Sequence, residues 1–206
     1  MLEIRLPEGV RQAALRDWRQ IGDITAEAFA EDPVNLWIFG NRQAMAPVFR
    51  TLARSIYLQR GLCHVCGDRG AAMWAHSGQS RALSTLQTMR LVWSLMMKGE
   101  KGAARRGLAA GEAMAREHPQ EAHLYLFTIG TRQAARGQGV GKTLIRPVLG
   151  AADRARLPCY LENTNPANTG FYVSHGFERI KRFEPGPGAP VMEAMWREPR
   201  QPRGSE

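Results

Sequence analysis

HLYLFTIGTRQAARGQGVGKTLIRPVLGAADRARLPCYLENTNPANTGFYVSHGF, residues 123–177, is the stretch that decides the fold. Its first nine residues are mostly β-branched, aromatic or aliphatic, a pattern typical of a strand buried on both faces. After a glycine-rich turn, apolar side chains recur at helical spacing over residues 143–155. A second short strand is expected at 158–162, an Asn-rich loop at 163–168, and one or two helical turns at 169–175. The order predicts two parallel strands joined by a helix.

The turn runs from Arg136 to Thr143 and reads RGQGVGKT. Its three glycines let the backbone turn tightly and expose its N–H groups. Because these groups also begin a helix, they form a site for an anion. Arg136 and Lys142 add positive charge. We therefore expect the turn to bind a pyrophosphate.

Three phosphate-binding patterns compete for this turn. A Walker A loop needs a glycine where the chain has Arg136, and Gly137 is one residue out of register. A Rossmann fingerprint needs its third glycine at position 142, but the chain has it at Gly141. The pattern Arg/Gln-x-x-Gly-x-Gly/Ala fits residues 136–141 at every fixed position. Taken alone, the six residues are also compatible with an ordinary glycine-rich turn.

The residues after the second strand narrow the choice. Asn165-x-x-Asn168-x-x-x-Tyr172 is followed by Gly176-Phe177. Together with RGQGVG, these motifs resemble the GNAT superfamily of N-acetyltransferases, and the resemblance runs from residue 123 to the end of the chain. Within that superfamily, the His-x-Tyr-Leu opening, the LEN segment and the strand before Trp196 look closest to puromycin N-acetyltransferase-like enzymes.

The resemblance implies an α/β (α+β) fold of the GNAT type. Helices would flank a central mixed sheet, mostly antiparallel, whose strands 4 and 5 are parallel and splay apart. We expect a single domain over 1–198, with a helical insertion at about 81–118 that breaks at 99–102, and a disordered tail at 199–206. The remaining elements predicted from periodicity are strands at 2–6, 177–183 and 191–196, helices at 17–30 and 43–60, an aromatic turn at 35–40, and a hairpin of 62–66 with 70–76.

In this family an acetyl-CoA co-substrate fills the gap between the splayed strands. By resemblance, backbone groups near Phe127, Ile129 and Thr131 would bind the pantetheine amides, and Asn168 would contact the same arm. The pyrophosphate would lie on the residues of the turn, which are Arg136, Gly137, Gln138, Gly139, Val140, Gly141, Lys142 and Thr143.

Attack of a neutral amine on a thioester needs a base for the amine and an acid for the leaving thiolate. Tyr172 is the acid that the resemblance implies, and a buried core tyrosine is the alternative. Glu162, at the end of the second strand, is the first choice for the base. His123, at the start of the facing strand, is the second choice because its pKa suits proton relay. Each of these two residues can instead be structural.

The expected function is acetyl transfer to a primary amine of a small molecule, antibiotic-like or nucleoside-like. A protein N-terminus or lysine is the alternative acceptor, and a non-catalytic acyl-CoA-binding module is the alternative class; the presence of Tyr172 favours an enzyme. Trp37 and Phe39 either line the acceptor site or pack in the core. The Met- and Trp-rich residues 81–118 either pack on the sheet, which we favour, or provide an apolar surface for an acceptor or a homodimer.

Composition excludes several other functions. The net charge is +9, but the 28 basic residues are scattered along the chain, so nucleic acid is not expected as a partner. No apolar run approaches the ~20 residues that span a bilayer, and the first 20 residues lack the apolar core of a signal peptide. Three cysteines predict a reduced, cytoplasmic protein. Cys63 and Cys66 would point to opposite faces of a strand, so no metal site is expected.

Overall fold

The computed structural model describes residues 2–79 and 83–200. Most of the tail predicted at 199–206 lies outside the described residues, as do the first two positions of the predicted insertion. Within the described ranges, seven strands form one sheet in the order β1-β2-β3-β4-β5-β7-β6. The strands are β1 (Val10–Gln12), β2 (Leu62–Cys66), β3 (Gly70–His76), β4 (Leu124–Thr131), β5 (Cys159–Asn163), β6 (Glu178–Phe183) and β7 (Met192–Arg197).

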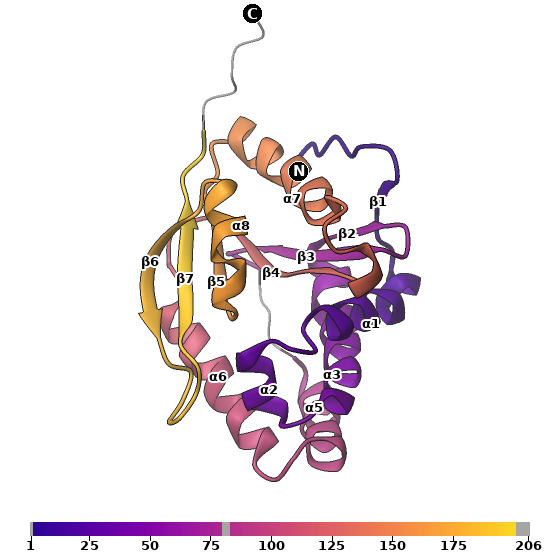
Figure 1. The fold of residues 1–206 in the computed structure, drawn as a ribbon, viewed down its shortest axis with the longest axis vertical. Helices are drawn as coiled ribbons and strands as arrows, with labels where there is room; N and C mark the ends of the chain where they lie inside the picture. The colour runs from indigo at the N-terminus through magenta and orange to yellow at the C-terminus, as the bar shows by residue number, and fades with distance from the viewer. Residues whose placement is uncertain (1, 80–82, 201–206) are drawn as a thin grey trace, which may run out of the picture.

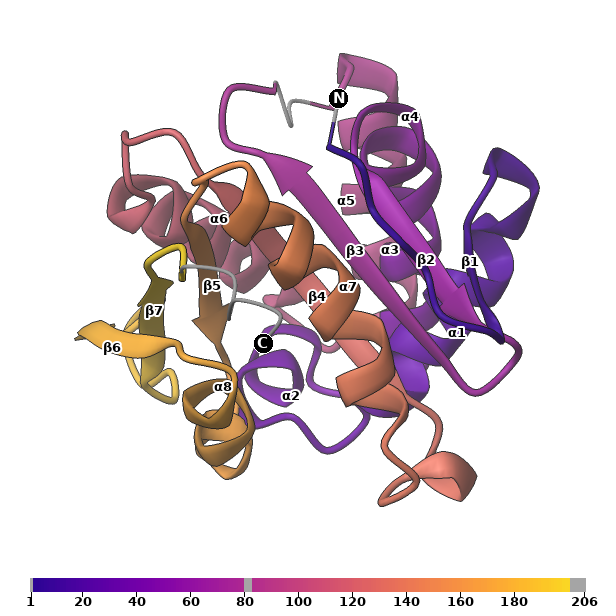
Figure 2. The ribbon, with the colours of Figure 1, turned by 90° about the horizontal axis from the view of Figure 1, so that it is seen from above.

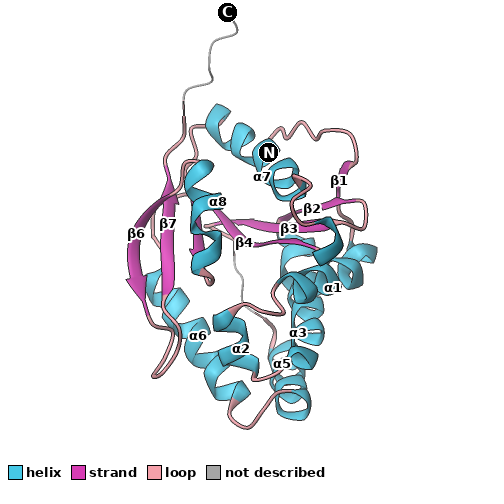
Figure 3. Cartoon of the chain, viewed as in Figure 1, coloured by secondary structure: helices cyan, strands magenta, loops and turns pink. Residues whose placement is uncertain are grey.

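Helices cover both faces of the sheet (Figures 1 and 3). The α-helices are α1 (Trp18–Ala28), α2 (Pro33–Phe39), α3 (Met45–Leu52), α4 (Leu58–Arg60), α5 (Thr85–Lys98), α6 (Ala103–Glu117), α7 (Val140–Arg154) and α8 (Thr169–Ser174). A π-helical segment, Ala53–Tyr57, joins α3 to α4, and short 3₁₀ turns lie at Leu15–Asp17, Arg42–Ala44, Gln133–Ala135 and Pro166–Asn168. Helix α7 packs on one face, and α1 with α3 packs on the other (Figure 2).

The parallel strands β4 and β5 separate as predicted. They pair only from Leu124 opposite Cys159 to Leu126 opposite Leu161, although both strands continue further. On its other side, β4 carries a bulge: Thr128 pairs with Met73 and Leu126 with Trp74, which leaves Phe127 without a register partner. The remaining strand pairs are antiparallel. The prediction of a mixed, mostly antiparallel GNAT-type sheet is confirmed.

Three local predictions were wrong. Residues 2–6 form no strand; their alternating apolar side chains are half-buried against the core under α7 without joining the sheet, and the first strand is β1. Residues 35–40 are not a turn but most of α2. Asp32 caps this helix by accepting from the Asn35 N–H at 2.8 Å, and Pro33 is its first residue. Helix α7 begins at Val140, three residues before the predicted start, because Gly139 serves as its N-cap.

The predicted break at 99–102 separates α5 from α6. One face of α5 is exposed, with Leu86, Met89, Trp93, Met96 and Met97 between 57% and 67% accessible. The homodimer remains a prediction. Cys63 packs toward α1 and Cys66 toward α7, so the two thiols lie on opposite faces of β2 as expected.

The turn between β1 and α1 is held by one buried carboxylate. Arg11 donates to both oxygens of Asp17, at 2.7 and 2.9 Å, and the Ala14 N–H donates at 2.8 Å. The hydrogen bonds from Arg11 lower the pKa of Asp17 to about 2. A carboxyl group with a lowered pKa stabilises the fold above its unfolded pKa of about 4 and loses that contribution as the pH falls toward 2.

We therefore expect Asp17→Asn to reduce the free energy of unfolding at pH 7 by about 2 kcal/mol. The difference between the wild type and the variant should shrink as the pH falls from 5 to 3, because the Asp17 carboxyl group of the unfolded wild type then binds a proton while that of the folded protein stays ionised. Urea unfolding at pH 7, 5, 4 and 3 measures this. A difference that is constant across these pH values would contradict the role given to the carboxylate charge.

Candidate active site

Two cavities meet beside the gap between β4 and β5. The larger one, of about 750 Å³, is named the basic cleft and lies between the end of α1, the glycine turn and α8. The smaller one, of about 280 Å³, is named the apolar cavity and lies between β4, β5 and helices α2, α3, α5 and α6. Phe29, Asn168 and Tyr172 line both. A molecule in one cavity can therefore touch a molecule in the other at these three residues.

The basic cleft is built on the N-terminus of α7. Gly137 and Gly139 have φ of 77° and 78°, a conformation that favours glycine. A Cβ atom on either residue would have no heavy atom within 4 Å, so the space beside the turn is open. The first N–H groups of α7 have no partner within the helix. Arg136 and Lys142 lie in the turn itself, so this end of the cleft suits a diphosphate; Glu31 and Asp32 also line the cleft.

Most of the residues predicted to bind the cofactor line this cleft: Ile129, Thr131, Arg136, Gly137, Gly139, Val140, Gly141, Lys142 and Asn168. Gln138 and Thr143 do not, because their side chains donate locally to the carbonyl oxygens of Ala134, at 2.9 Å, and Gly139, at 3.1 Å. Phe127 lines the apolar cavity instead, and its ring stacks on Tyr57 with 4.4 Å between centroids.

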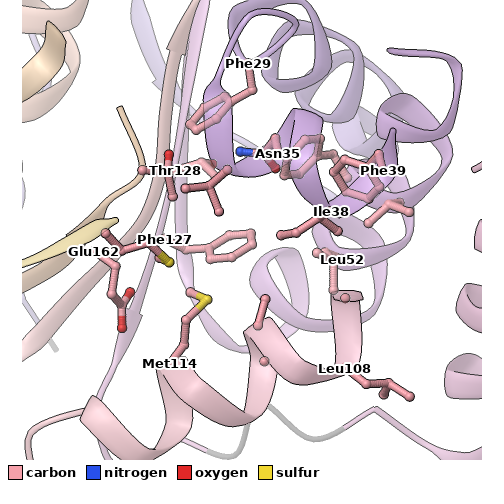
Figure 4. Close-up of a pocket in the computed structure, with 18 of the residues that line it drawn as sticks. Phe29, Asn35, Ile38, Phe39, Leu52, Leu108, Met114, Phe127, Thr128 and Glu162 are labelled. Atoms are coloured by element: carbon pink, nitrogen blue, oxygen red, sulfur yellow. The ribbon is translucent and has the colours of Figure 1, made fainter. Parts of the chain in front are cut away.

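The apolar cavity takes its wall from distant parts of the chain (Figure 4). Phe127 projects into it from β4, Ile38 from α2, Leu52 from α3 and Met114 from α6. The predicted pocket residue Phe39 lines it as well. Trp37 does not; a Cβ atom on Gly186 would lie 3.0 Å from its ring, which places Trp37 against the loop between β6 and β7.

Glu162 brings a charge into this cavity. Its side chain is 1% exposed, and neither carboxylate oxygen has a hydrogen-bond partner in the described part of the chain. The Nδ1 atom of His118 lies 3.6 Å from Oε1, just too far for a hydrogen bond. A buried carboxylate is costly without a hydrogen bond or a cation. Glu162 is therefore suited to pair with a positively charged group of a ligand.

His123 lies behind this carboxylate and lines neither cavity. Its Nε2 is 3.1 Å from Nε2 of His118, and its Nδ1 is 2.7 Å from the carbonyl oxygen of Glu121. His118, just after α6, thus connects Glu162 to His123. His118 was not predicted from the sequence. The sequence signal that could have indicated it is a second histidine five residues before His123, between a helix and a strand.

Tyr172 is buried, and rings of Phe171 and Phe177 contact it edge-on, with centroids 5.4 and 6.1 Å away. Burial, and then the Asp32 carboxylate, raise the pKa of Tyr172 above its ordinary value. The hydroxyl group therefore carries its proton at neutral pH and can donate it. Asp32 itself accepts hydrogen bonds from Asn35 and from the Thr164 hydroxyl group.

Comparison with known proteins agrees with this geometry. Residues 100–179 match the family model described as acetyltransferase (GNAT) domain. A structure from Corynebacterium glutamicum, described as "histone acetyltransferase HPA2 and related acetyltransferase", is 26% identical with a TM-score of 0.70, covering 95% of this chain and 98% of that one. Arylalkylamine N-acetyltransferase 2 from Aedes aegypti is 12% identical (TM-score 0.63; 93% and 98% covered). An agmatine N-acetyltransferase mutant is 15% identical (TM-score 0.59; 92% and 98% covered). At these two lower identities the likeness concerns the fold alone.

The sheet opens between two parallel strands above a glycine-rich helix N-terminus, which is the arrangement of the GNAT fold. Residues 100–179 match a GNAT acetyltransferase domain, and the comparisons support an acyltransferase. The closer likeness to puromycin N-acetyltransferases stays a prediction. In residues 2–79 and 83–200, no helix combines the length and hydrophobicity that crossing a bilayer requires.

Proposed function

We propose that this acyltransferase moves an acetyl group from acetyl-CoA to the primary amine of a small molecule. The observation that carries the proposal is the shared wall of the two cavities: Tyr172 and Asn168 face both the basic cleft and the apolar cavity. One cavity then holds the acyl donor and the other the acceptor, and the reacting atoms meet where the cavities join.

The basic cleft fits acetyl-CoA in three respects. The N–H groups at the start of α7, with Arg136 and Lys142, suit the pyrophosphate. Ile129 and Thr131 lie on the part of β4 that has left β5, so their backbone can bind the amides of the pantetheine arm. Asn168 lies at the junction of the cavities, beside the expected path of that arm.

The reaction forms a C–N bond and breaks the C–S bond of the thioester. Glu162 takes a proton from the amine, and Tyr172 gives a proton to the departing thiolate. The Nδ1 atom of His118 lies 3.6 Å from the Glu162 carboxylate, and its Nε2 is 3.1 Å from Nε2 of His123, whose Nδ1 is 2.7 Å from the carbonyl oxygen of Glu121. We place Glu162 before His123 as the base because Glu162 lines the acceptor cavity and His123 does not.

Calorimetry with acetyl-CoA tests the donor site. We expect micromolar binding by the wild type and at least about 30-fold weaker binding by Gly139→Val, whose side chain would occupy the open space beside the turn. Gly9→Val is the matched control. Gly9 also has φ of 78°, and a Cβ atom there would have no heavy atom within 4 Å, so it carries the same backbone strain outside the basic cleft.

The two variants should lose similar stability, about 1–2 kcal/mol each. If both bind acetyl-CoA equally well, the turn does not hold the pyrophosphate. If the wild type fails to bind acetyl-CoA at millimolar concentration, the donor proposal is wrong.

A further inference from the structure

Glu162 is the only charged residue among the described residues that line the apolar cavity. The chain has 28 lysines and arginines, yet none of them reaches this wall in the described part of the chain. The carboxylate is buried without a hydrogen bond. The Nδ1 atom of His118 lies 3.6 Å from Oε1, beyond hydrogen-bond distance. Because a buried carboxylate without a hydrogen bond is costly, the ligand that fills this space should bring one positive charge.

The rest of the wall is mostly apolar. It includes aromatic rings from the C-cap of α1 and from α2, α3 and β4, and aliphatic side chains from α5 and α6, among them Phe29, Phe39, Phe49, Phe127, Leu95 and Met114. Thr128 adds a buried hydroxyl group that has no hydrogen-bond partner among the described residues. A ligand with many polar groups would lose hydrogen bonds to water here without replacing them.

The volume limits the size of the ligand. A cavity of about 150 Å³ lined by apolar side chains holds benzene. The apolar cavity has about 280 Å³, which suits a ring with a short chain or a comparable aliphatic body. Most atoms of a nucleoside-bearing acceptor would lie outside a cavity of this size.

We infer that the acceptor is a primary amine with an uncharged apolar body, whose ammonium group pairs with Glu162 before transfer. This inference rests on the proposed function and narrows its acceptor class. The wall has no cation to receive a carboxylate in the described part of the chain, so an amino acid should be a far poorer acceptor than its decarboxylated amine. A polyamine is disfavoured as well, because its second charge would lie in the apolar wall.

Helix α6 offers a substitution that tests the fit. Gly111 lines the cavity, and a Cβ atom there would have no heavy atom within 4 Å. Gly111 is itself exposed, so Gly111→Leu should add an apolar side chain at the cavity wall without a clash, while leucine favours the helix over glycine. Gly150→Leu in α7 is the matched control, because its Cβ would make only an ordinary 3.7 Å contact with Arg154 outside both cavities.

The experiment measures thiol release from acetyl-CoA with 2-phenylethylamine, phenylalanine, spermidine and ethylamine. We expect kcat/KM for 2-phenylethylamine to exceed that for phenylalanine and for spermidine by at least about 100-fold. Gly111→Leu should lower kcat/KM for 2-phenylethylamine by at least about 10-fold and leave ethylamine within about threefold. Gly150→Leu should change neither.

Calorimetric titration of 2-phenylethylamine into the protein gives a readout that does not depend on transfer. Binding that Gly111→Leu weakens supports the inference even if acetyl-CoA proves not to be the donor. Transfer to spermidine or phenylalanine without transfer to 2-phenylethylamine overturns the inference while the proposed function stands. If 2-phenylethylamine neither binds nor reacts, the inference is also overturned.

Discussion

Replacing Glu162 by glutamine is expected to lower kcat/KM for amine acetylation by about 10³-fold, within the usual range for a general base. Glutamine has the same shape but can neither take a proton nor pair with an ammonium ion. Because Glu162 does not line the basic cleft, the Kd for acetyl-CoA should stay within about twofold. Steady-state thiol release and calorimetry on the same preparation measure the two quantities.

The same substitution should make the protein more stable. The wild-type carboxylate is buried with no hydrogen bond in the described residues, and neutralising it removes a desolvation cost. We expect the free energy of unfolding to rise by roughly 1–2 kcal/mol. Replacing a residue that has only a structural role seldom raises stability and lowers activity together. The two effects combined would therefore indicate that Glu162 acts in the reaction.

Glu193→Gln, on the adjacent strand β7, provides the matched control. Glu193 is also buried, but it accepts from Thr169 at 2.6 Å, Arg179 at 2.8 Å and Asn163 at 3.1 Å. Burial opposes its ionisation, yet these hydrogen bonds prevail and lower the pKa of Glu193. Glu193→Gln should therefore lose stability and retain its rate. If Glu162→Gln instead keeps the wild-type rate, the base lies elsewhere, and His123 becomes the first residue to test.

The half of the fold after residue 123 could be predicted because its information is local. The glycines of the turn, the apolar periodicity of α7 and the Asn-to-Tyr spacing at α8 each specify a short segment. Predictions for the first half of the chain were wrong at places where the same residue pattern fits two different structures. Alternating residues 2–6 are half-buried without pairing in the sheet, and Pro33 both follows one helix and begins the next.

The site can likewise be divided into residues that motifs predict and residues that only the fold brings together. Tyr172, Asn168 and the turn follow from motifs, and the structure brings them to one cleft. The apolar cavity could not be predicted, because its lining residues are spread from Phe29 to Met192 and no short stretch of sequence shows that they come together. The prediction for Phe127 concerned its backbone; its side chain lines the apolar cavity, which the sequence did not indicate.

Tyr172→Phe is expected to lower kcat by about 10²-fold and to leave the Kd for acetyl-CoA nearly unchanged. The phenyl ring keeps the edge-on contacts with Phe171 and Phe177, so only the hydroxyl group is lost. The effect should be smaller than that of Glu162→Gln, because a thiol has a pKa near 8.5 and its thiolate leaves more readily than an alkoxide would. Tyr57→Phe is the matched control, since Tyr57 is buried but lines neither cavity.

The pH dependence separates an acid from a packing residue. Burial raises the pKa of Tyr172 above its ordinary value of about 10, so the hydroxyl group should stay protonated from pH 6 to 9. The ratio of wild-type to Tyr172→Phe rates should then be constant over this range, because the lost proton donor is equally available at each pH. A ratio that falls toward 1 by pH 9 would show that the tyrosine ionises there. A rate equal to wild type would show that Tyr172 only packs, and that the thiolate leaves without an acid from this residue.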